Sequence, residues 1–278
     1  MVRDDAEITD LRELIVTDTR FMATEEAERI RDFVRGGGTL IATGLTSLLD
    51  IDGTLREDFQ LADVLGISYS GQMSKRVCYL YLEDGQNRQR ISEWVSCNQP
   101  SPMVSATTAN VIAYLAEPLF DPDDPQHWTS IHSNPPGKIT EYAAFTENQY
   151  GKGKCVYLAP AIFGISQDAQ KCFNTWLLDQ YLSPCAVKTT NAPPCVEITI
   201  LKSTTKKAYI ICFVNYQREL PNIPIRDLCT RVELPTNTQL VSIRRISDGV
   251  KIVHGNNDDI NLQIPILDTL EMFTLEYK

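Results

Sequence analysis

The first clear pattern of hydrophobic and polar positions runs through residues 13–44. Two apolar runs, Glu13–Thr17 and Thr39–Gly44, have the length and composition of buried strands. Between them, apolar residues recur at helical spacing and predict the buried stripe of one helix: Ala27, Ile30, Phe33 and Val34. Thr24 is expected to cap this helix, and three successive glycines end it. The order strand–helix–strand predicts a unit of a parallel α/β sheet.

The pattern becomes less regular after this unit, but it still predicts short elements up to residue 188. A short helix is expected over Phe59–Leu65, followed by strands over Val77–Leu82, Trp94–Cys97 and Val111–Leu115. This run of short strands fits either an antiparallel extension of the sheet or an inserted subdomain. The remaining elements are predicted as two strands and a helix that Ser166 caps: Thr140–Phe145, Gly153–Pro160 and Gln167–Leu182.

The pattern changes again after Asn191–Pro194, where only short alternating strands separated by turn residues remain. Seven such strands predict an antiparallel β-sandwich. We therefore expect an α/β domain over residues 1–188, with a strand-rich extension over 67–150, and a β-sandwich domain over 189–278.

Composition narrows the classes of partner and cofactor. The net charge is −10, and the whole acidic excess lies in the first 188 residues, which argues against nucleic acid and anionic membranes as partners. No apolar run approaches the length of a membrane span. The eight cysteines include no CxxC pair and there are only three histidines, so we expect no metal site and no cofactor. Reduced, buried thiols in a cytoplasmic protein are the favoured interpretation.

The turn after the second strand is the first candidate site. Thr46, Ser47 and Asp50 follow that strand, at the edge of the sheet where open α/β folds bind ligands. Asp50–Gly53 could be a metal loop, but a simple Asp-Gly turn is favoured because the other calcium-loop ligands are absent. No G-x-S-x-G motif surrounds Ser47, so a catalytic serine is disfavoured.

The proline-rich loop over 117–137 is the second candidate site. It combines aromatic, acidic, hydroxyl and histidine side chains, a mixture that suits sugars, and we single out Asp121, Trp128, Ser130 and His132. The alternative is a proline-fixed loop that only covers a sheet edge or meets a neighbouring subunit, and this alternative is favoured.

The order of the elements resembles the C-terminal part of family-42-type β-galactosidases and related glycoside hydrolases. In that region a class I glutamine-amidotransferase-like domain, the β-galactosidase trimerisation domain, precedes a small β-sandwich. The segments that carry the resemblance are ELIVTDTRFMATEEAERIRDFVRGGGTLIATGLTSLLD, LADVLGI, SIHSNPPG, NQYGKGKCVYLAP and CFVNYQ. The resemblance implies a flavodoxin-like parallel sheet for the first domain.

Two departures from the resemblance bear on function. Active glutamine amidotransferases carry a nucleophilic cysteine at the strand turn where this sequence has Gly44, so acyl transfer is not expected and we predict no catalytic residues. The opening strand and helix of the family domain and the catalytic barrel of the parent hydrolases are also missing, and residues 2–9 would be only the second strand. The sequence is therefore interpreted as a fragment, a truncated gene product, or a protein that completes its sheet with a partner.

These observations favour a non-catalytic accessory or oligomerisation region of a glycoside-hydrolase-type protein. Its expected partners are further copies of itself or a glycoside-hydrolase catalytic domain. A carbohydrate-binding module is the first alternative, and it depends on Trp128 and His132 lying exposed in a groove. A hydrolase of unknown type is the second, and it would need an acid/base pair such as Asp50 with His132.

Overall fold

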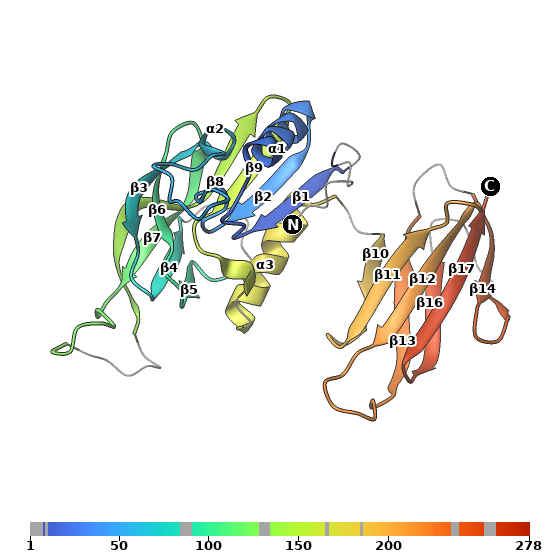
Figure 1. Cartoon of the computed structure of the whole chain (residues 1–278). Coiled ribbons are helices and arrows are strands. Elements are labelled where there is room, and N and C mark those ends of the chain that lie inside the picture. Colours follow the sequence, from blue (N-terminus) through green and yellow to red (C-terminus); the bar gives the residue numbers. More distant parts are fainter. Residues whose placement is uncertain are drawn as a thin grey trace. The chain divides into compact units, whose positions relative to one another are not determined.

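The computed structural model describes residues 8, 11–83, 91–127, 134–164, 167–183, 186–234, 239–252 and 260–278. The chain divides into two compact units, Met1–Ser183 and Pro184–Lys278 (Figure 1). Across the described ranges, no helix is both long and apolar enough to cross a membrane.

The first unit begins with the predicted strand–helix–strand. β1 (Glu13–Thr17) and β2 (Thr39–Thr43) are parallel and in register, and α1 (Thr24–Gly36) connects them. β2 also pairs in parallel with β9 (Gly153–Leu158), which therefore forms the third parallel strand. The two apolar runs thus become adjacent strands of one sheet. β2 is buried as predicted, whereas β1 is not: only Val16 of β1 is buried, because among the described residues β1 has a strand partner on one side only.

The stripe predicted for α1 is the one that is buried: Ala27, Ile30, Phe33 and Val34. The N-cap, however, is Ala23 rather than Thr24. Ala23 has an extended backbone and its N–H donates to Glu26 Oε2 at 2.9 Å, whereas Thr24 is already helical. Gly37 follows the helix at φ +122°, and its N–H donates to the carbonyl oxygen of Val34, which ends the helix as expected.

The strands between β2 and β9 extend this sheet with antiparallel pairing, which decides between the two alternatives left open by the sequence. The sheet order is β1-β2-β9-β8-β7-β4-β5, and two further strands, β3 and β6, pair with each other while β6 also pairs with β8. β3 and β6 were not predicted, because β3 has mostly polar side chains after Ile67 and β6 is a five-residue strand that begins with a proline. The bounds are β3 Ile67–Met73, β4 Cys78–Leu82, β5 Trp94–Cys97, β6 Pro102–Ala106, β7 Asn110–Pro118 and β8 Pro136–Tyr150.

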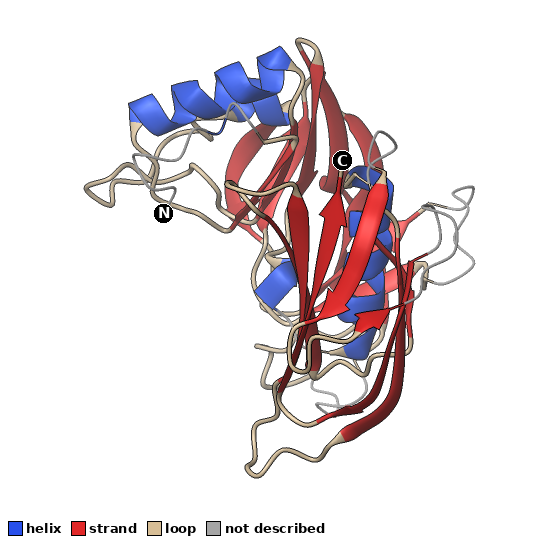
Figure 2. Cartoon of the chain, turned by 90° about the vertical axis from the view of Figure 1, so that its right-hand side faces the viewer, coloured by secondary structure: helices blue, strands red, loops and turns tan. Residues whose placement is uncertain are grey.

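The helices of this unit cover opposite faces of the sheet (Figure 2). On β9, a Cβ added to Gly153 would touch the backbone of Val34 in α1, while the neighbouring Lys154 places its Nζ over the ring of Tyr181 in α3. Successive strand residues point to opposite faces, so α1 and α3 lie on different sides. The bounds of the remaining helices are α2 Ala62–Leu65, η2 Ile162–Gly164 and α3 Asp168–Tyr181. α2 is shorter than the helix predicted there, and Ser166, the expected cap of α3, lies outside the described residues.

The second unit is antiparallel, with a three-stranded sheet β10-β13-β16 and a five-stranded sheet β11-β12-β17-β14-β15. One buried apolar cluster draws on both sheets, with Leu228 and Ile264 from the first and Phe213 and Phe273 from the second. Within the described part of this unit there are eight strands where seven were predicted. β10 was missed because Val187 is the one apolar side chain among its four residues. The bounds are β10 Val187–Thr190, β11 Val196–Lys202, β12 Ala208–Asn215, β13 Ile225–Val232, β14 Leu240–Arg245, β15 Lys251–Ile252, β16 Ile260–Leu267 and β17 Leu270–Tyr277.

Candidate functional site

The turns after β1 and β2 are locked together by the carboxylate of Asp18. Asp18 has a left-handed backbone (φ +46°), and its N–H donates to Thr43. Its Oδ1 accepts the N–H of Leu45 at 2.8 Å, and its Oδ2 accepts two hydrogen bonds from the guanidinium of Arg20 at 2.9 and 3.0 Å. The sequence analysis did not single out Asp18, although its place directly after a predicted strand was a usable signal.

Asp18 occupies the space that a side chain at position 44 would need. Gly44 has φ +63°, and a Cβ built on it would lie 2.3 Å from Asp18 Oδ1. The carbonyl oxygen of Gly44 accepts a hydrogen bond from the hydroxyl of the fully buried Tyr157 at 2.7 Å. Burial, aided by the charge of Asp18, raises the pKa of Tyr157 well above its usual value, so this hydroxyl stays a neutral donor. A nucleophilic side chain cannot be accommodated at position 44 without displacing Asp18.

Thr46 and Ser47 are both fully buried, and their hydroxyl groups bond to the backbone. Thr46 Oγ1 donates to the carbonyl oxygen of Thr43 at 2.7 Å and accepts the N–H of Thr19. Ser47 Oγ accepts the N–H of Leu61 at 3.2 Å. These contacts hold the turn against β1 and against the start of α2.

Asp50 lies in a turn in which the N–H of Gly53 donates to its carbonyl oxygen at 2.9 Å. Its carboxylate accepts the N–H of Ile51 and pairs with Arg56 at 2.9 Å. Hydrogen bonds from Thr54 lower the pKa of the neighbouring Asp52. Within the described ranges no three His, Cys, Asp or Glu side chains gather as metal ligands.

The loop after β7 is closed at its base by paired backbone contacts. The N–H of Leu119 donates to the carbonyl oxygen of Pro135 at 2.8 Å, and Phe120 and the side chain of Asn134 exchange two hydrogen bonds. Asp121 accepts the N–H of Asp123 and pairs with Lys75 at 3.1 Å, and these contacts lower its pKa.

Three other candidate residues of this loop, Trp128, Ser130 and His132, lie outside the described residues. Asp121 shares no hydrogen-bond partner with Thr46, Ser47 or Asp50 among the contacts described. Thr46 and Ser47 therefore bond to neighbouring backbone segments, while Asp50 lies in a turn of its own. Among the contacts of the described residues, none joins these three candidates to Asp121.

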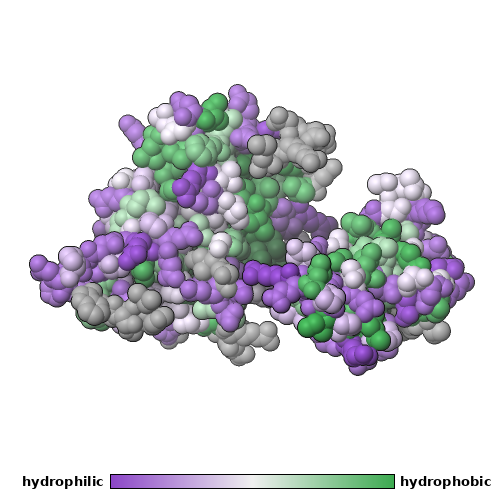
Figure 3. Space-filling view, turned by 60° about the horizontal axis from the view of Figure 1, so that its bottom comes forward, coloured by the Kyte–Doolittle hydropathy of each residue, from purple (hydrophilic) through white to green (hydrophobic). Residues whose placement is uncertain are grey.

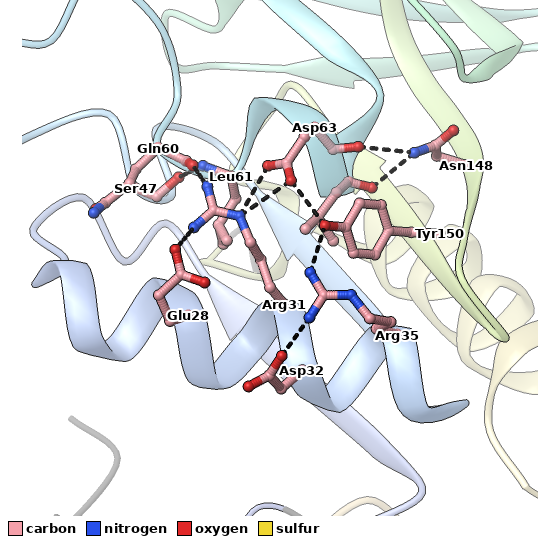
Figure 4. Close-up of polar contacts among 11 residues, drawn as sticks. Glu28, Arg31, Asp32, Arg35, Ser47, Gln60, Leu61, Asp63, Asn148 and Tyr150 are labelled. Carbon is pink, nitrogen blue, oxygen red and sulfur yellow. Dashed lines mark hydrogen bonds and ion pairs between the residues drawn. The ribbon is translucent and has the colours of Figure 1, made fainter.

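A polar cluster that the sequence analysis missed joins α1, α2 and the β8–β9 hairpin (Figure 4). Arg31 Nε contacts both carboxylate oxygens of Asp63, at 3.1 and 3.2 Å, and the Tyr150 hydroxyl donates to the same carboxylate at 2.9 Å. Arg35 in turn donates to Tyr150 Oη at 3.2 Å. The only sequence signal was two arginines four residues apart on one helix.

The charges in this cluster are compensated within it. Burial works against the ionised form of Asp63, but the hydrogen bonds from Arg31 and Tyr150 outweigh it and lower the pKa of Asp63. Arg31 also pairs with Glu28 at 2.8 Å. The cluster therefore holds α1, α2 and the β8–β9 hairpin together, and its charged groups are already paired with each other rather than available to a ligand.

The family of this chain follows from comparison with known protein families. The family described as "Beta-galactosidase trimerisation domain" matches residues 1–188. The chain belongs to the β-galactosidase trimerisation domain family. This confirms the resemblance seen in the sequence, and the match covers the whole mixed sheet of the first unit. A search of curated proteins returned no significant match.

Solved structures share this fold at low sequence identity. The chain is similar to "Alpha-L-fucosidase isoenzyme 2 from Paenibacillus thiaminolyticus", with TM-score 0.75, 17% identity and coverage of 99% of this chain and 42% of that one. It is similar to the β-galactosidase of Bacillus circulans sp. alkalophilus, with TM-score 0.65, 16% identity and coverage of 98% and 34%. The β-galactosidase of Rahnella sp. R3 gives TM-score 0.61, 20% identity and coverage of 99% and 33%. The trimerisation-domain chain thus spans less than half of each of these structures.

Proposed function

We propose that this trimerisation-domain chain is a non-catalytic accessory and oligomerisation region of a glycoside-hydrolase-type protein. The match of residues 1–188 to the trimerisation domain carries the proposal. The turn at Gly44 supports it, because Asp18 fills the place of a nucleophile and the hydroxyls of Thr46 and Ser47 bond to the backbone.

The edge at β1 is the self-association surface that we propose. Among the described residues, β1 has a strand partner only on its β2 side. The carbonyl oxygen of Arg12 accepts the N–H of Thr39, and the N–H of Asp18 donates to the carbonyl oxygen of Thr43. Because every second residue of a strand faces the same neighbour, the N–H and C=O groups of Glu13, Ile15 and Thr17 point away from β2. The unpaired N–H and C=O groups of an edge strand can pair with a strand of another chain, and apolar side chains along the edge favour such association.

Apolar side chains accompany this edge. Ile15 is 41% exposed and Phe21 55% exposed, and a cavity of about 640 Å³ beside them is also lined by Leu14, Met22 and Ile30. Figure 3 shows apolar residues reaching the surface of both units. An exposed apolar edge of this kind is typical of an interface.

Solution mass across a dilution series tests the proposal. Light scattering coupled to size exclusion is expected to give a dimer or trimer that dissociates on dilution. A monomer at every concentration would contradict self-association. The second proposed partner, a glycoside-hydrolase catalytic domain, is then tested by adding such a domain and measuring the mass again.

Finer expectations from the sequence also remain proposals. We propose that the parallel strands derive from a flavodoxin-like sheet, that residues 189–278 form a β-sandwich, and that the protein is cytoplasmic. Seven cysteines in the described part are free, which supports a reducing location. Carbohydrate binding rests on Trp128 and His132, and titration of oligosaccharides against Trp128 fluorescence would test it.

A further inference from the structure

Two cysteines far apart in the sequence face each other in the sheet of the first unit. Cys78 begins β4 and Cys97 ends β5, and the antiparallel register pairs them directly. Both are free thiols and both are buried, with exposed fractions of 1% and 0%. No motif in the sequence marks the pair, because nineteen positions separate the two residues (97 − 78).

The register places the two thiols within reach of a covalent bond. Directly opposed residues of antiparallel strands have Cα atoms about 4.5–5.5 Å apart, and disulfides span Cα separations of about 4.4–6.8 Å. Paired residues also point to the same face of a sheet, so both side chains face the core together with Leu80 and Val95.

The surroundings of Cys78 favour its thiolate. Cys78 Sγ lies 3.4 Å from Ser101 Oγ, and the pair of thiols hydrogen-bond to each other. The hydrogen bond from Cys97 is the largest cause that lowers the pKa of Cys78 to about 7, while the pKa of Cys97 is raised. A thiolate beside a second thiol is the arrangement that oxidises to a disulfide.

The position of β5 gives a small oxidant a route to the buried pair. β5 has four residues, is the last strand in the sheet order and pairs with β4. Short edge strands open locally at low free-energy cost compared with the unfolding of a whole domain. An oxidant the size of hydrogen peroxide can therefore reach Cys78 without global unfolding.

We propose that Cys78 and Cys97 are a reversible redox pair, which a peroxide converts into an intramolecular disulfide. The Cys78 thiolate attacks one peroxide oxygen, the O–O bond breaks, and a sulfenic acid and one water form once a proton is taken up. Cys97 then attacks the sulfenic sulfur, the S–S bond forms and a second water leaves. The two thiols supply the two electrons that reduce the peroxide, and a dithiol reductant reverses the reaction.

A disulfide between Cys78 and Cys97 would restrain α3 as well as β4 and β5. Gln170 of α3 donates from Nε2 to the backbone oxygen of Ser96 and to Ser96 Oγ, so α3 rests on β5 directly beside Cys97. A link between Cys78 and Cys97 ties β5 to β4 and thereby restrains α3. We expect oxidation to raise the thermal midpoint of the first unit by several degrees.

Mass spectrometry of the full chain tests the proposal directly. The chain in which the exposed Cys172 and Cys229 are replaced by serine is treated with hydrogen peroxide under native conditions, then alkylated and digested. We expect a linked peptide pair that contains Cys78 and Cys97, the loss of two titratable thiols, and recovery of both with a dithiol reductant. Peroxide treatment that leaves both thiols free, or oxidises either one without linking the two, would overturn the proposal.

Two variants separate this pair from other cysteines. Cys97→Ser is expected to abolish the linked peptide and the rise in thermal midpoint, whereas Cys155→Ser, which removes a fully buried cysteine from β9, is expected to keep both. Should Cys97→Ser fail to fold, the linked peptide in the parent chain still decides the question. A link that forms only in urea would show that the native register does not bring the thiols together, and would overturn the proposal.

Discussion

At the scale of single residues, the conformation of the turn after β2 depends on the contact between Gly44 and Asp18. The space beside Gly44 holds the Asp18 carboxylate, which bonds to Leu45 and Arg20. The glycine at position 44, where the resembling amidotransferases carry a cysteine, thus lies where a side chain would meet Asp18. A residue with a side chain at this position meets both an unfavourable backbone conformation and an occupied site.

Gly44→Ala is expected to destabilise the first unit. A left-handed non-glycine residue costs about 1–3 kcal/mol, and the displacement of Asp18 adds to this cost. Urea unfolding monitored by circular dichroism measures the change in the free energy of unfolding. Gly36→Ala is the matched control, because a Cβ on Gly36 meets open space at the end of α1, and it should change stability little or raise it by up to about 1 kcal/mol.

Asp63 gives the first unit a pH dependence of known sign. Its pKa is lowered in the folded chain, so its contribution to stability is present above the unfolded-state pKa and is lost as pH falls through the folded pKa. We expect Asp63→Asn to lower the free energy of unfolding at about pH 7 and to lower it much less at about pH 3. Asp179→Asn, which changes an exposed carboxylate of α3, should have little effect at either pH. Equal losses for Asp63→Asn at both pH values would contradict the role assigned to its charge.

At the scale of elements, the strand–helix–strand at the start of the first unit follows from its own sequence. The stripe on α1 and the apolar run of β2 indicate which residues are buried before any partner is known. The apolar run of β1 indicates a strand, but only Val16 of it is buried. The sequence does not predict that β7 and β8 pair within the same sheet. An antiparallel extension of that sheet and a separate inserted subdomain would show the same local pattern of short strands. β3 and β6 were missed for a related reason: β3 pairs with β6 and β6 also pairs with β8, and these long-range pairings stabilise strands whose local pattern is weak.

The edge of β1 supplies the prediction at this scale. Ile15→Lys places a charge on the proposed interface, and we expect it to weaken self-association at least tenfold without a large loss of stability. Ile139→Lys on β8 is the matched control, because Ile139 is 40% exposed and Ile15 is 41% exposed. Masses measured over the same dilution series compare the two variants. Equal association by both variants and the parent chain would place the interface elsewhere, while the oligomerisation role itself would stand.

At the scale of the whole molecule, the family match covers the first unit, and the structural similarity covers nearly the entire chain. The similar structures extend well beyond the aligned part, since the chain spans 33–42% of the three described above. The accessory role proposed above, with further copies or a catalytic domain as partners, is therefore tested at this scale by the mass of the assembled particle in solution. The redox pair is independent of that role, because a Cys78–Cys97 link would restrain β5 whether or not the chain assembles.

The sequence by itself determined most of the elements and the resemblance to the family, which the match over residues 1–188 confirmed. Apolar runs, helical spacing and glycines act within a few residues of one another, so they can be recognised without the fold. Only the tertiary structure decided which distant side chains meet: Asp18 beside Gly44, Arg31 with Asp63 and Tyr150, and Cys78 opposite Cys97. The physical reason is strand register and helix packing, which join positions tens of residues apart and leave no local pattern in the chain.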